Sequence, residues 1–441
     1  MGVTSKYWKW WVCSLLLFAS AVNYMDRMTL ASVSRRVIEE LQLSKADYGM
    51  VEQYFGYAFA FGAIIFGLVV DRVSAKWLYP AVLALWSLMG GFTAYAGALG
   101  GVSALSSLLI CRTLLGFFES GHWPCALQTT QRLLAPEHRA LGNSILQSGV
   151  SIGAIVTPFI INAILTPEAG SWRLPFIVIG AVGIIWVFAW IFTMRGQVVE
   201  VPVKTREKRH WSAGLREILA DHRFWLLAIV VSCINTTWSL YRTWLPLALQ
   251  DKAGLAFSEE QTLGRILPTY YILTDIGCIA AGAATVWLHR KGVSVLNSRR
   301  CVFTVCSILV LPAMILPNLA RGEYAIPGLA PIQASMLMLF MTAAGSLGVF
   351  PCYYAFVQEL SKRNIGLVTG MLSFVAWIVG SSLQKPLGAH IDRTGSYDFA
   401  FQAGAWPILG AAICLWLFWD LPWSRSQRAI PTSSVGGEQK P

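Results

Sequence analysis

Apolar runs of about 20 residues recur along almost the whole chain, and each is near the length that a helix needs to span a bilayer. The chain has 441 residues, of which 55% are hydrophobic and 13% are charged, and its mean hydropathy is +0.55. Soluble domains carry about 25% charged residues. The sequence therefore predicts an all-α polytopic membrane protein with most of its length inside the bilayer.

We expect twelve transmembrane helices, arranged as two six-helix halves. The spans lie at residues 10–30, 48–70, 77–99, 104–127, 141–165, 174–194, 224–249, 263–288, 301–316, 330–357, 365–387 and 399–418. The longest polar segment between spans divides them six and six. This gives an N-terminal half at 1–194, a basic cytoplasmic linker at 195–223, a C-terminal half at 224–421 and a disordered cytoplasmic tail at 422–441.

The basic residues are distributed unevenly between the two sides of the membrane. Most of the 34 Lys and Arg residues fall on the side that a cytoplasmic N-terminus would define as the inside. This bias follows the positive-inside rule and predicts a multi-pass protein of the cell (inner) membrane with both termini cytoplasmic. The net charge of +11 then reflects topology, and we expect no nucleic-acid partner.

Motifs of enzymes and metal proteins are missing from the sequence. It has no G-x-x-x-x-G-K-[ST] and no H-E-x-x-H, and its nine cysteines include no C-x-x-C pair. We therefore expect no enzymatic activity, no cofactor and no metal. The expected partners are the lipid bilayer and small solutes, and we expect a monomer.

Charged residues interrupt two of the apolar runs near their middle. Asp26 and Arg27 lie in the first run, and Arg112 and Glu119 lie in the fourth. A charge at the centre of a membrane helix costs roughly 2.5–3.5 kcal/mol on insertion scales, so such residues usually face a polar cavity. Arg112 and Glu119 are about two helical turns apart and share one face. A cation and a titratable carboxylate on one wall indicate a site that binds an anion and handles a proton.

A charged motif follows the second span. The segment from Gly67 to Lys76 reads G-L-V-V-D-R-V-S-A-K. Two six-helix halves and a motif of the form G-x-x-x-D-R-x-x-x-R/K resemble the major facilitator superfamily (MFS), whose halves rock around a central site. The resemblance implies that Gly67 permits close helix approach. It also implies that Asp71 and Arg72 form a cytoplasmic charge latch.

Further segments resemble one branch of that superfamily, the anion:cation symporters, which include hexuronate and galactonate carriers. These segments are Asn23-Tyr24-Met25-Asp26-Arg27, the pattern Arg112-x-x-x-Gly116-x-x-Glu119-x-x-x-x-Pro124, the loop Pro136-Glu137-His138-Arg139, residues 148–154, Trp244-Leu245-Pro246, Asp275-Ile276-Gly277 and residues 392–397. Together they cover nearly the whole chain except the tail.

The resemblance implies roles for the charged residues in the spans. Arg27 and Arg112 would bind the anion, because a guanidinium forms a planar fork that matches a carboxylate. The alternative is that each is paired structurally, with Asp26 or Glu119. Asp26 and Glu119 are the proton-coupling candidates, since cavity closure or substrate binding changes the balance between burial and nearby Arg that sets a carboxylate's protonation.

The chain departs from the branch at several candidate binding positions. Gln147 lies one turn before Val150, which stands where galactonate-type carriers have a substrate-binding Gln. Tyr57 lies close to Phe59, which replaces a common Tyr. Arg242 replaces a usually apolar residue, and we expect it to bind a second acidic group or the far end of a sugar acid.

Polar side chains form stripes on two predicted spans. Trp377, Ser381 and Gln384 share one face of the span at 365–387 with Ser373. A similar stripe on the span at 141–165 consists of Asn143, Gln147 and Ser151. Such stripes either bind a hydroxyl-rich substrate or hydrogen-bond neighbouring helices.

Three other ionisable residues have open roles. His122 follows Glu119 by three residues and is either a proton relay or structural. Asp275 either pairs with Arg242 or supports helix packing, and Lys385 is either a second-half cation of the site or a snorkelling residue.

We therefore expect a secondary transporter that imports a small organic anion with protons by alternating access. A sugar acid such as a hexuronate or aldonate is the expected substrate. An organic-anion exchanger or a Na⁺-coupled carrier is the alternative within transport, and a non-transporting membrane sensor is the alternative from a different class.

Overall fold

The computed structural model describes residues 6–70, 73–98, 101–134, 136–195, 218–251, 257–360 and 365–420. These residues form helices and connecting turns, with no strand among them. The first group of helices, here the N-terminal group, comprises α1 (Lys6–Glu40), α2 (Lys45–Val70), α3 (Ala75–Phe92), α4 (Ala104–Glu119), α5 (His122–Leu133), α6 (Pro136–Ile164) and α7 (Arg173–Thr193).

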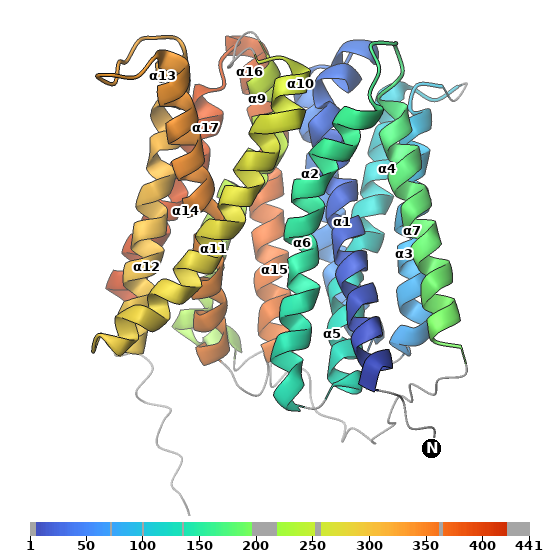
Figure 1. Ribbon diagram of the computed structural model, residues 1–441, viewed down its shortest axis with the longest axis vertical. Coiled ribbons are helices and arrows are strands. Elements are labelled where there is room, and N and C mark those ends of the chain that lie inside the picture. The colour runs from blue at the N-terminus through green and yellow to red at the C-terminus, as the bar shows by residue number, and fades with distance from the viewer. Residues whose placement is uncertain are drawn as a thin grey trace, which may run out of the picture.

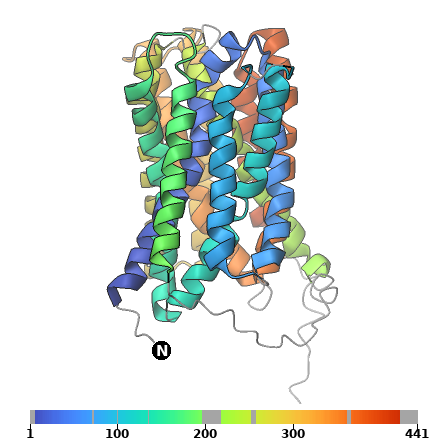
Figure 2. The same cartoon turned by 90° about the vertical axis from the view of Figure 1, so that its right-hand side faces the viewer.

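The second group, the C-terminal group, begins with α9 at the end of the predicted linker. It comprises α9 (His222–Gln250), α10 (Glu259–Gln261), α11 (Leu267–Arg290), α12 (Val295–Val310), α13 (Leu316–Ala320), α14 (Pro331–Leu360), α15 (Ile365–Ser382), α16 (Gln384–Thr394) and α17 (Asp398–Phe418). The long helices of both groups lie roughly along a common axis, and the two groups stand side by side (Figures 1 and 2).

The predicted spans correspond to these helices, but several are longer or divided. The first span continues ten residues past its predicted end to Glu40, because the polar end of α1 makes ion pairs that an apolar run cannot reveal. The fourth is divided into α4 and α5 at Ser120 and Gly121. The eleventh is divided into α15 and α16 at Leu383.

Eight helices in the described part of the chain are long and apolar enough to cross a membrane. α1 and α4 are not among them. α1 has a low mean hydropathy because it carries Asp26 and Arg27, and α4 has only 16 residues and carries Arg112. The two helices with the most conspicuous charges therefore depend on protein neighbours for burial.

The groups meet along α2, which packs against α15 and α16. A Cβ added at Gly49 would collide with the backbone of Gln384, and one added at Gly388 would collide with the backbone of Lys45. Small residues at these two positions let the helix backbones approach closely. This seam fixes where the two groups touch at the end of the molecule that carries α10 and α16 (Figure 1).

Ion pairs also join the groups at this end, which lies opposite the N-terminus (Figure 1) and is called the outer end below. Arg36 Nε donates to Glu259 Oε1 over 2.9 Å, and Lys45 Nζ donates to Asp251 Oδ2 over 2.6 Å. Asp392 accepts from the backbone N–H of Lys45 at 2.9 Å and so caps the first turn of α2 from the other group. The outer end is thus closed by contacts between the groups.

One phenol supports the outer closure. The hydroxyl of Tyr397, in the turn before α17, donates to Asp251 Oδ2 over 2.8 Å. Burial and the neighbouring Asp251 carboxylate raise the pKa of Tyr397. The phenol therefore remains a donor at every physiological pH.

Parts of the predicted latch and linker lie outside the described residues. Asp71 and Arg72, most of the linker at 195–223 and the tail at 422–441 are among the residues that the structure does not describe. Gly67 is described, and a Cβ placed there meets no described atom within 4 Å. The close helix approach expected at Gly67 is therefore not seen among the described residues.

Candidate functional site

Arg27 and Glu119 form a buried ion pair between two helices of the N-terminal group. Arg27 Nε on α1 donates to Glu119 Oε2 over 2.7 Å, and Glu119 is the last residue of α4. The side chains are 7% and 0% exposed. Removing one member of such a pair leaves an uncompensated buried charge, which is strongly destabilising. The pair therefore fixes α1 against α4 in this conformation.

Glu52 bridges two further buried arginines. Its Oε1 accepts from Arg112 Nη2 on α4 over 2.9 Å, and its Oε2 accepts from Arg242 Nη2 on α9 over 2.7 Å. Glu52 itself lies on α2, so this bridge joins three helices and both groups. We call the three arginines together with Glu52 and Glu119 the charged cluster.

Aromatic rings separate the arginines of the charged cluster. The Arg27 guanidinium carbon lies 4.7 Å from the ring centroid of Phe59 and 5.5 Å from that of Trp377. The Phe55 ring lies between two cations, 5.8 Å from Arg27 and 4.9 Å from Arg112. Cation–π attraction partly offsets the loss of hydration for each guanidinium. Arg27 thereby has an apolar wall contributed by both groups of helices.

Each of the three arginines keeps a buried donor atom that has no hydrogen-bond partner among the described residues. The atoms are Arg27 Nη2, Arg112 Nε and Arg242 Nη1. A buried polar atom that lacks a partner costs free energy, so native proteins rarely leave one unsatisfied without a reason. A ligand with acceptor oxygens would form hydrogen bonds with these three guanidinium donors.

Asp26 lies beside the cluster without an ion pair in the described part of the chain. Its side chain is 4% exposed and faces Gly90 of α3, and its Oδ2 has no hydrogen-bond partner. Its backbone carbonyl accepts from Arg112 Nη1 over 3.4 Å. Asp26 is therefore a buried carboxylate that no cation holds in the described structure, unlike Glu52 and Glu119, which are both held by arginines.

The structure shows one of the pairings that the sequence suggested and replaces the other. The structural alternative paired each arginine with Asp26 or Glu119, and of these two carboxylates Arg27 pairs with Glu119, the one on the other helix. Arg112 pairs instead with Glu52. Neighbouring residues on a helix point about 100° apart, and residues seven apart are separated by about 10 Å along the axis. Each arginine therefore pairs with a carboxylate on another helix.

Most of the other predicted binding residues lie where the two groups meet. The Tyr57 hydroxyl contacts the Ser382 hydroxyl at 2.7 Å, and Gln384 Oε1 accepts from Trp244 Nε1 over 2.8 Å. Ser381 packs so closely on Gly56 that a Cβ there would collide with it, and Trp377 lies against the same glycine. Gln147 is placed on α6, but its side chain is outside the described part of the structure.

The residues with open roles have defined contacts. His122 is fully buried and hydrogen-bonds Ser20 at 3.0 Å and Tyr79 at 2.8 Å, beyond the interruption that separates α5 from Glu119. Asp275 accepts from Ser151 over 2.5 Å and so joins α11 to α6. Lys385 is exposed near the outer end.

Glu52 was not among the residues that sequence reasoning selected. It lies five residues into the predicted span at 48–70, where a carboxylate is expected to reach the membrane interface. The signal that could have identified it is its position as the one acidic residue between Asp47 and Asp71 in an apolar run. Its two partners come from other helices and cannot be read from this spacing.

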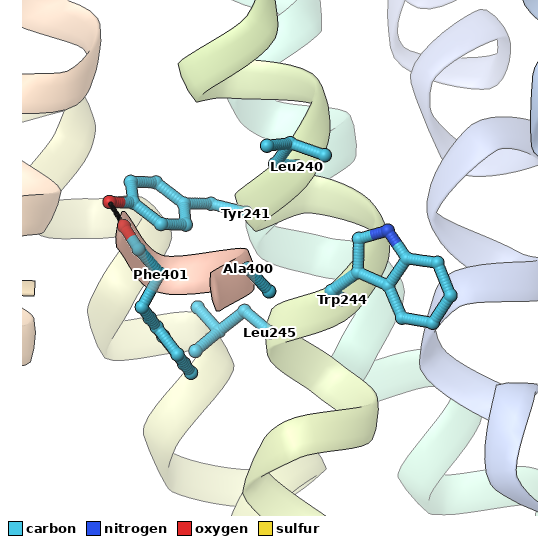
Figure 3. Close-up of a pocket in the computed structure, with 6 residues that line it drawn as sticks. All are labelled: Leu240, Tyr241, Trp244, Leu245, Ala400 and Phe401. Carbon is cyan, nitrogen blue, oxygen red and sulfur yellow. Dashed lines mark hydrogen bonds between the residues drawn. The ribbon is translucent and has the colours of Figure 1, made fainter. Parts of the chain in front are cut away.

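The cavities in the described structure lie away from the charged cluster. Figure 3 shows a crevice between α9 and α17, where the Tyr241 hydroxyl donates to the Phe401 carbonyl over 3.2 Å. The crevice has no room for a water molecule. A hollow of about 240 Å³ near His390 and Arg393 opens at the outer end. Neither of these two cavities is lined by a residue of the charged cluster, whose side chains are between 0% and 7% exposed, so the cluster is enclosed in this conformation.

The chain is similar to known transporters along most of its length. Two curated relatives are hexuronate transporters. The one from Escherichia coli (strain K12) is 24% identical over 92% of this chain and 93% of its own length, and the one from Bacillus subtilis (strain 168) is 27% identical over 88% and 90%. A probable L-galactonate transporter of Escherichia coli (strain K12) is 24% identical over 88% of this chain and 84% of its own length.

Solved structures agree on the fold. A bacterial homolog of the human lysosomal transporter Spinster, inward-facing and unoccupied, matches with a TM-score of 0.70 at 17% identity over 93% of this chain and 95% of that one. A D-xylose-proton symporter matches with a TM-score of 0.73 at 13% identity over 94% and 98%. These relatives and structures are membrane transporters and not enzymes. The family profile described as Major Facilitator Superfamily matches residues 16–384, and the chain therefore belongs to that superfamily.

Proposed function

We propose that the chain is a proton-coupled importer of a sugar acid, a hexuronate or an aldonate, that works by alternating access. One observation carries the proposal. Arg27, Arg112 and Arg242, drawn from both groups of helices, each keep a buried guanidinium donor without a partner. A carboxylate supplies the acceptor oxygens for such donors and forms charge-assisted hydrogen bonds with them.

The surroundings of the arginines favour a sugar acid over a purely apolar anion. Trp377 and Phe59 offer ring faces beside Arg27. Asn23 lies one helical turn before Arg27 on α1, and its buried Nδ2 has no partner among the described residues, so it can bind a hydroxyl group. Several relatives favour this class: they are hexuronate transporters, a galacturonate transporter, a probable L-galactonate transporter and a probable galactarate/D-glucarate transporter. Another relative is a probable sulfoacetate transporter, which also carries an organic anion.

Proton coupling is assigned to Glu119 and Asp26. Glu119 holds Arg27 by an ion pair that requires the ionised carboxylate. Protonation of Glu119 therefore releases Arg27 for the substrate, and deprotonation on the opposite side of the membrane expels the substrate. Asp26 is the second site because it is buried with no cation to hold its charge. Binding of the anion and of protons is coupled through Arg27.

Alternating access requires the contacts at the outer end to break and form again. The pairs Arg36–Glu259 and Lys45–Asp251 close the outer end in this conformation. We assign the outer end to the outside of the inner membrane and both termini to the cytoplasm, following the charge bias of the loops. The transporter is proposed to work as a monomer, since the charged cluster is complete within one chain.

Uptake by the purified protein in proteoliposomes tests the proposal. The panel is D-glucuronate, D-galacturonate, D-galactonate and D-glucarate, with D-glucose as the neutral control, in Na⁺-free buffer under an inward pH gradient. We expect accumulation of at least one acid and none of glucose. Uptake that requires Na⁺, or that occurs only against a preloaded anion, would replace the proposal with a Na⁺-coupled carrier or an exchanger. Binding without any transport would favour a membrane sensor.

A further inference from the structure

Glu52 holds two arginines in the way that a substrate carboxylate would. Each of its oxygens meets one guanidinium, Oε1 with Arg112 at 2.9 Å and Oε2 with Arg242 at 2.7 Å. Each guanidinium gives one charge-assisted hydrogen bond to a different oxygen, so Glu52 holds both arginines through its two oxygens. Glu52 thus fills an anion site made by the protein's own cations.

The bridge spans the boundary between the two groups of helices. Glu52 and Arg112 belong to the N-terminal group, whereas Arg242 belongs to α9 of the C-terminal group. The neighbouring Tyr48 hydroxyl donates across the same boundary to the Thr243 carbonyl over 3.0 Å. Breaking the Glu52–Arg242 pair therefore removes an attraction between the groups at the level of the substrate site.

The charge balance of the bridge leaves an attraction for a further anion. Arg112 and Arg242 carry two positive charges against one negative charge on Glu52. All three side chains are nearly inaccessible, between 0% and 4% exposed, so solvent does not screen this imbalance. Arg112 Nε and Arg242 Nη1 remain without partners. Glu119 is held by Arg27, so a substrate carboxylate that approaches these donors competes with Glu52 for Arg112 and Arg242.

We propose that Glu52 is an internal ligand of the substrate site, bridging Arg112 and Arg242 in the unloaded carrier until the substrate carboxylate takes its place. The inference rests on the proposed function and deepens it. In the open, hydrated state the substrate displaces Glu52 from one or both arginines. After release, Glu52 returns, neutralises one cation and allows the empty carrier to close. Symport needs this empty closure, whereas strict exchange does not.

The first test compares Glu52→Gln with the wild-type protein, using D-glucuronate as the probe. Gln keeps the shape but loses the charge that competes with the substrate. We expect the Kd from calorimetry to fall at least about tenfold, equivalent to about 1.4 kcal/mol. We expect net uptake by proteoliposomes to fall at least about tenfold, while counterflow exchange is retained. Glu39→Gln, which removes a carboxylate paired with Arg35 on the surface, should change neither quantity.

A second variant with a shorter carboxylate, Glu52→Asp, keeps the test decisive if Glu52→Gln does not fold. Asp at position 52 keeps the charge but cannot reach both guanidinium groups, so Glu52→Asp should give intermediate values of Kd and net uptake. An unchanged or higher Kd in both folded variants would overturn the proposal. It would also be overturned if net uptake and counterflow fell together, because Glu52 would then be a structural counterion.

A substrate-independent measurement separates this inference from the proposed function. Spin labels are placed at Val102→Cys, just before α4, and at Tyr324→Cys, in the turn after α13, where both native side chains are exposed. Without the Glu52 charge, Arg112 and Arg242 repel each other across the boundary. Double electron–electron resonance should therefore show a longer distance population in Glu52→Gln than in the wild type. An unchanged distribution would overturn the bridge, whereas failure of the wild type to take up any acid of the panel would overturn only the proposed function.

Discussion

Arg27 of α1 and Glu119 of α4 are joined by a hydrogen-bonded ion pair of 2.7 Å in a fully enclosed part of the bundle. The pair connects a residue suited to anion binding with a carboxylate suited to proton exchange. The substrate carboxylate and the ionised Glu119 carboxylate would compete for Arg27. Occupancy of Arg27 by a substrate and ionisation of Glu119 therefore oppose each other. In the proposed mechanism this competition couples the movement of the proton to that of the anion.

Replacing Glu119 with Gln should abolish proton-driven accumulation while leaving counterflow exchange. Gln preserves the shape and can still accept a hydrogen bond from Arg27, but it cannot titrate. We expect an imposed pH gradient to drive no accumulation, so that the labelled substrate only equilibrates across the membrane. The measurement is radiolabelled sugar-acid uptake by proteoliposomes with and without the gradient. Wild-type accumulation by this variant would exclude Glu119 as a coupling site.

Arg112→Lys should weaken substrate binding by at least about tenfold although it keeps the positive charge. An ammonium lacks the planar fork, so it cannot hold Glu52 and offer a second directed donor as Arg112 does. Arg27→Lys should behave similarly. Isothermal titration calorimetry measures the effect, with Arg35→Lys on the partly exposed end of α1 as the control. An unchanged Kd would give Arg112 a purely structural role.

Much of the fold follows from the apolar runs, because span length and polar interruptions are local properties. The breaks between α4 and α5 and between α15 and α16 were not predicted, since the runs continue through them. The charged residues of the spans were found because burial of Asp26, Arg27, Arg112 and Glu119 needs a reason. Their partners were not, because pairing depends on the rotation and register of separate helices.

Glu52 shows most clearly how the location of a residue can differ from the one that its sequence position suggests. Its carboxylate is as buried as that of Glu119, yet its position near the end of a predicted span made an interfacial location the simpler expectation. Only the packing of α2 against α4, together with the approach of the α9 side chain Arg242, brings it to Arg112 and Arg242. Sequence spacing within one helix carries no information about such a three-helix contact.

Gly49→Val should keep the outer end from closing. A side chain at Gly49 would collide with the backbone of Gln384 on α16, which cannot move as a flexible side chain could. We expect reduced transport and increased labelling of a cysteine introduced along the seam, at Gln53→Cys. Gly410→Val is the matched control, since a Cβ there meets no described atom within 4 Å. Equal transport by the two variants would contradict a role of this seam in closure.

The last prediction concerns the charge that moves with the substrate. A monovalent sugar acid carried with one proton transfers no net charge, so only the pH gradient would drive it. Asp26 and Glu119 are two titratable sites beside Arg27 and Arg112, and two protons per anion would make uptake electrogenic. Each additional positive charge that enters gains about 2.3 kcal/mol per 100 mV of membrane potential, which is close to fiftyfold in accumulation.

We therefore expect an inside-negative potential to stimulate uptake of a monoanion, and we expect a transient current on solid-supported membranes. The arginines and Glu52 remain in the protein, so this current reports the protons and the substrate that cross. Asp26→Asn should abolish the current while one proton still accompanies each anion through Glu119. Robust uptake by the wild type with no transient current would mean one proton per anion, and Asp26 would then be a buried structural carboxylate rather than a second coupling site.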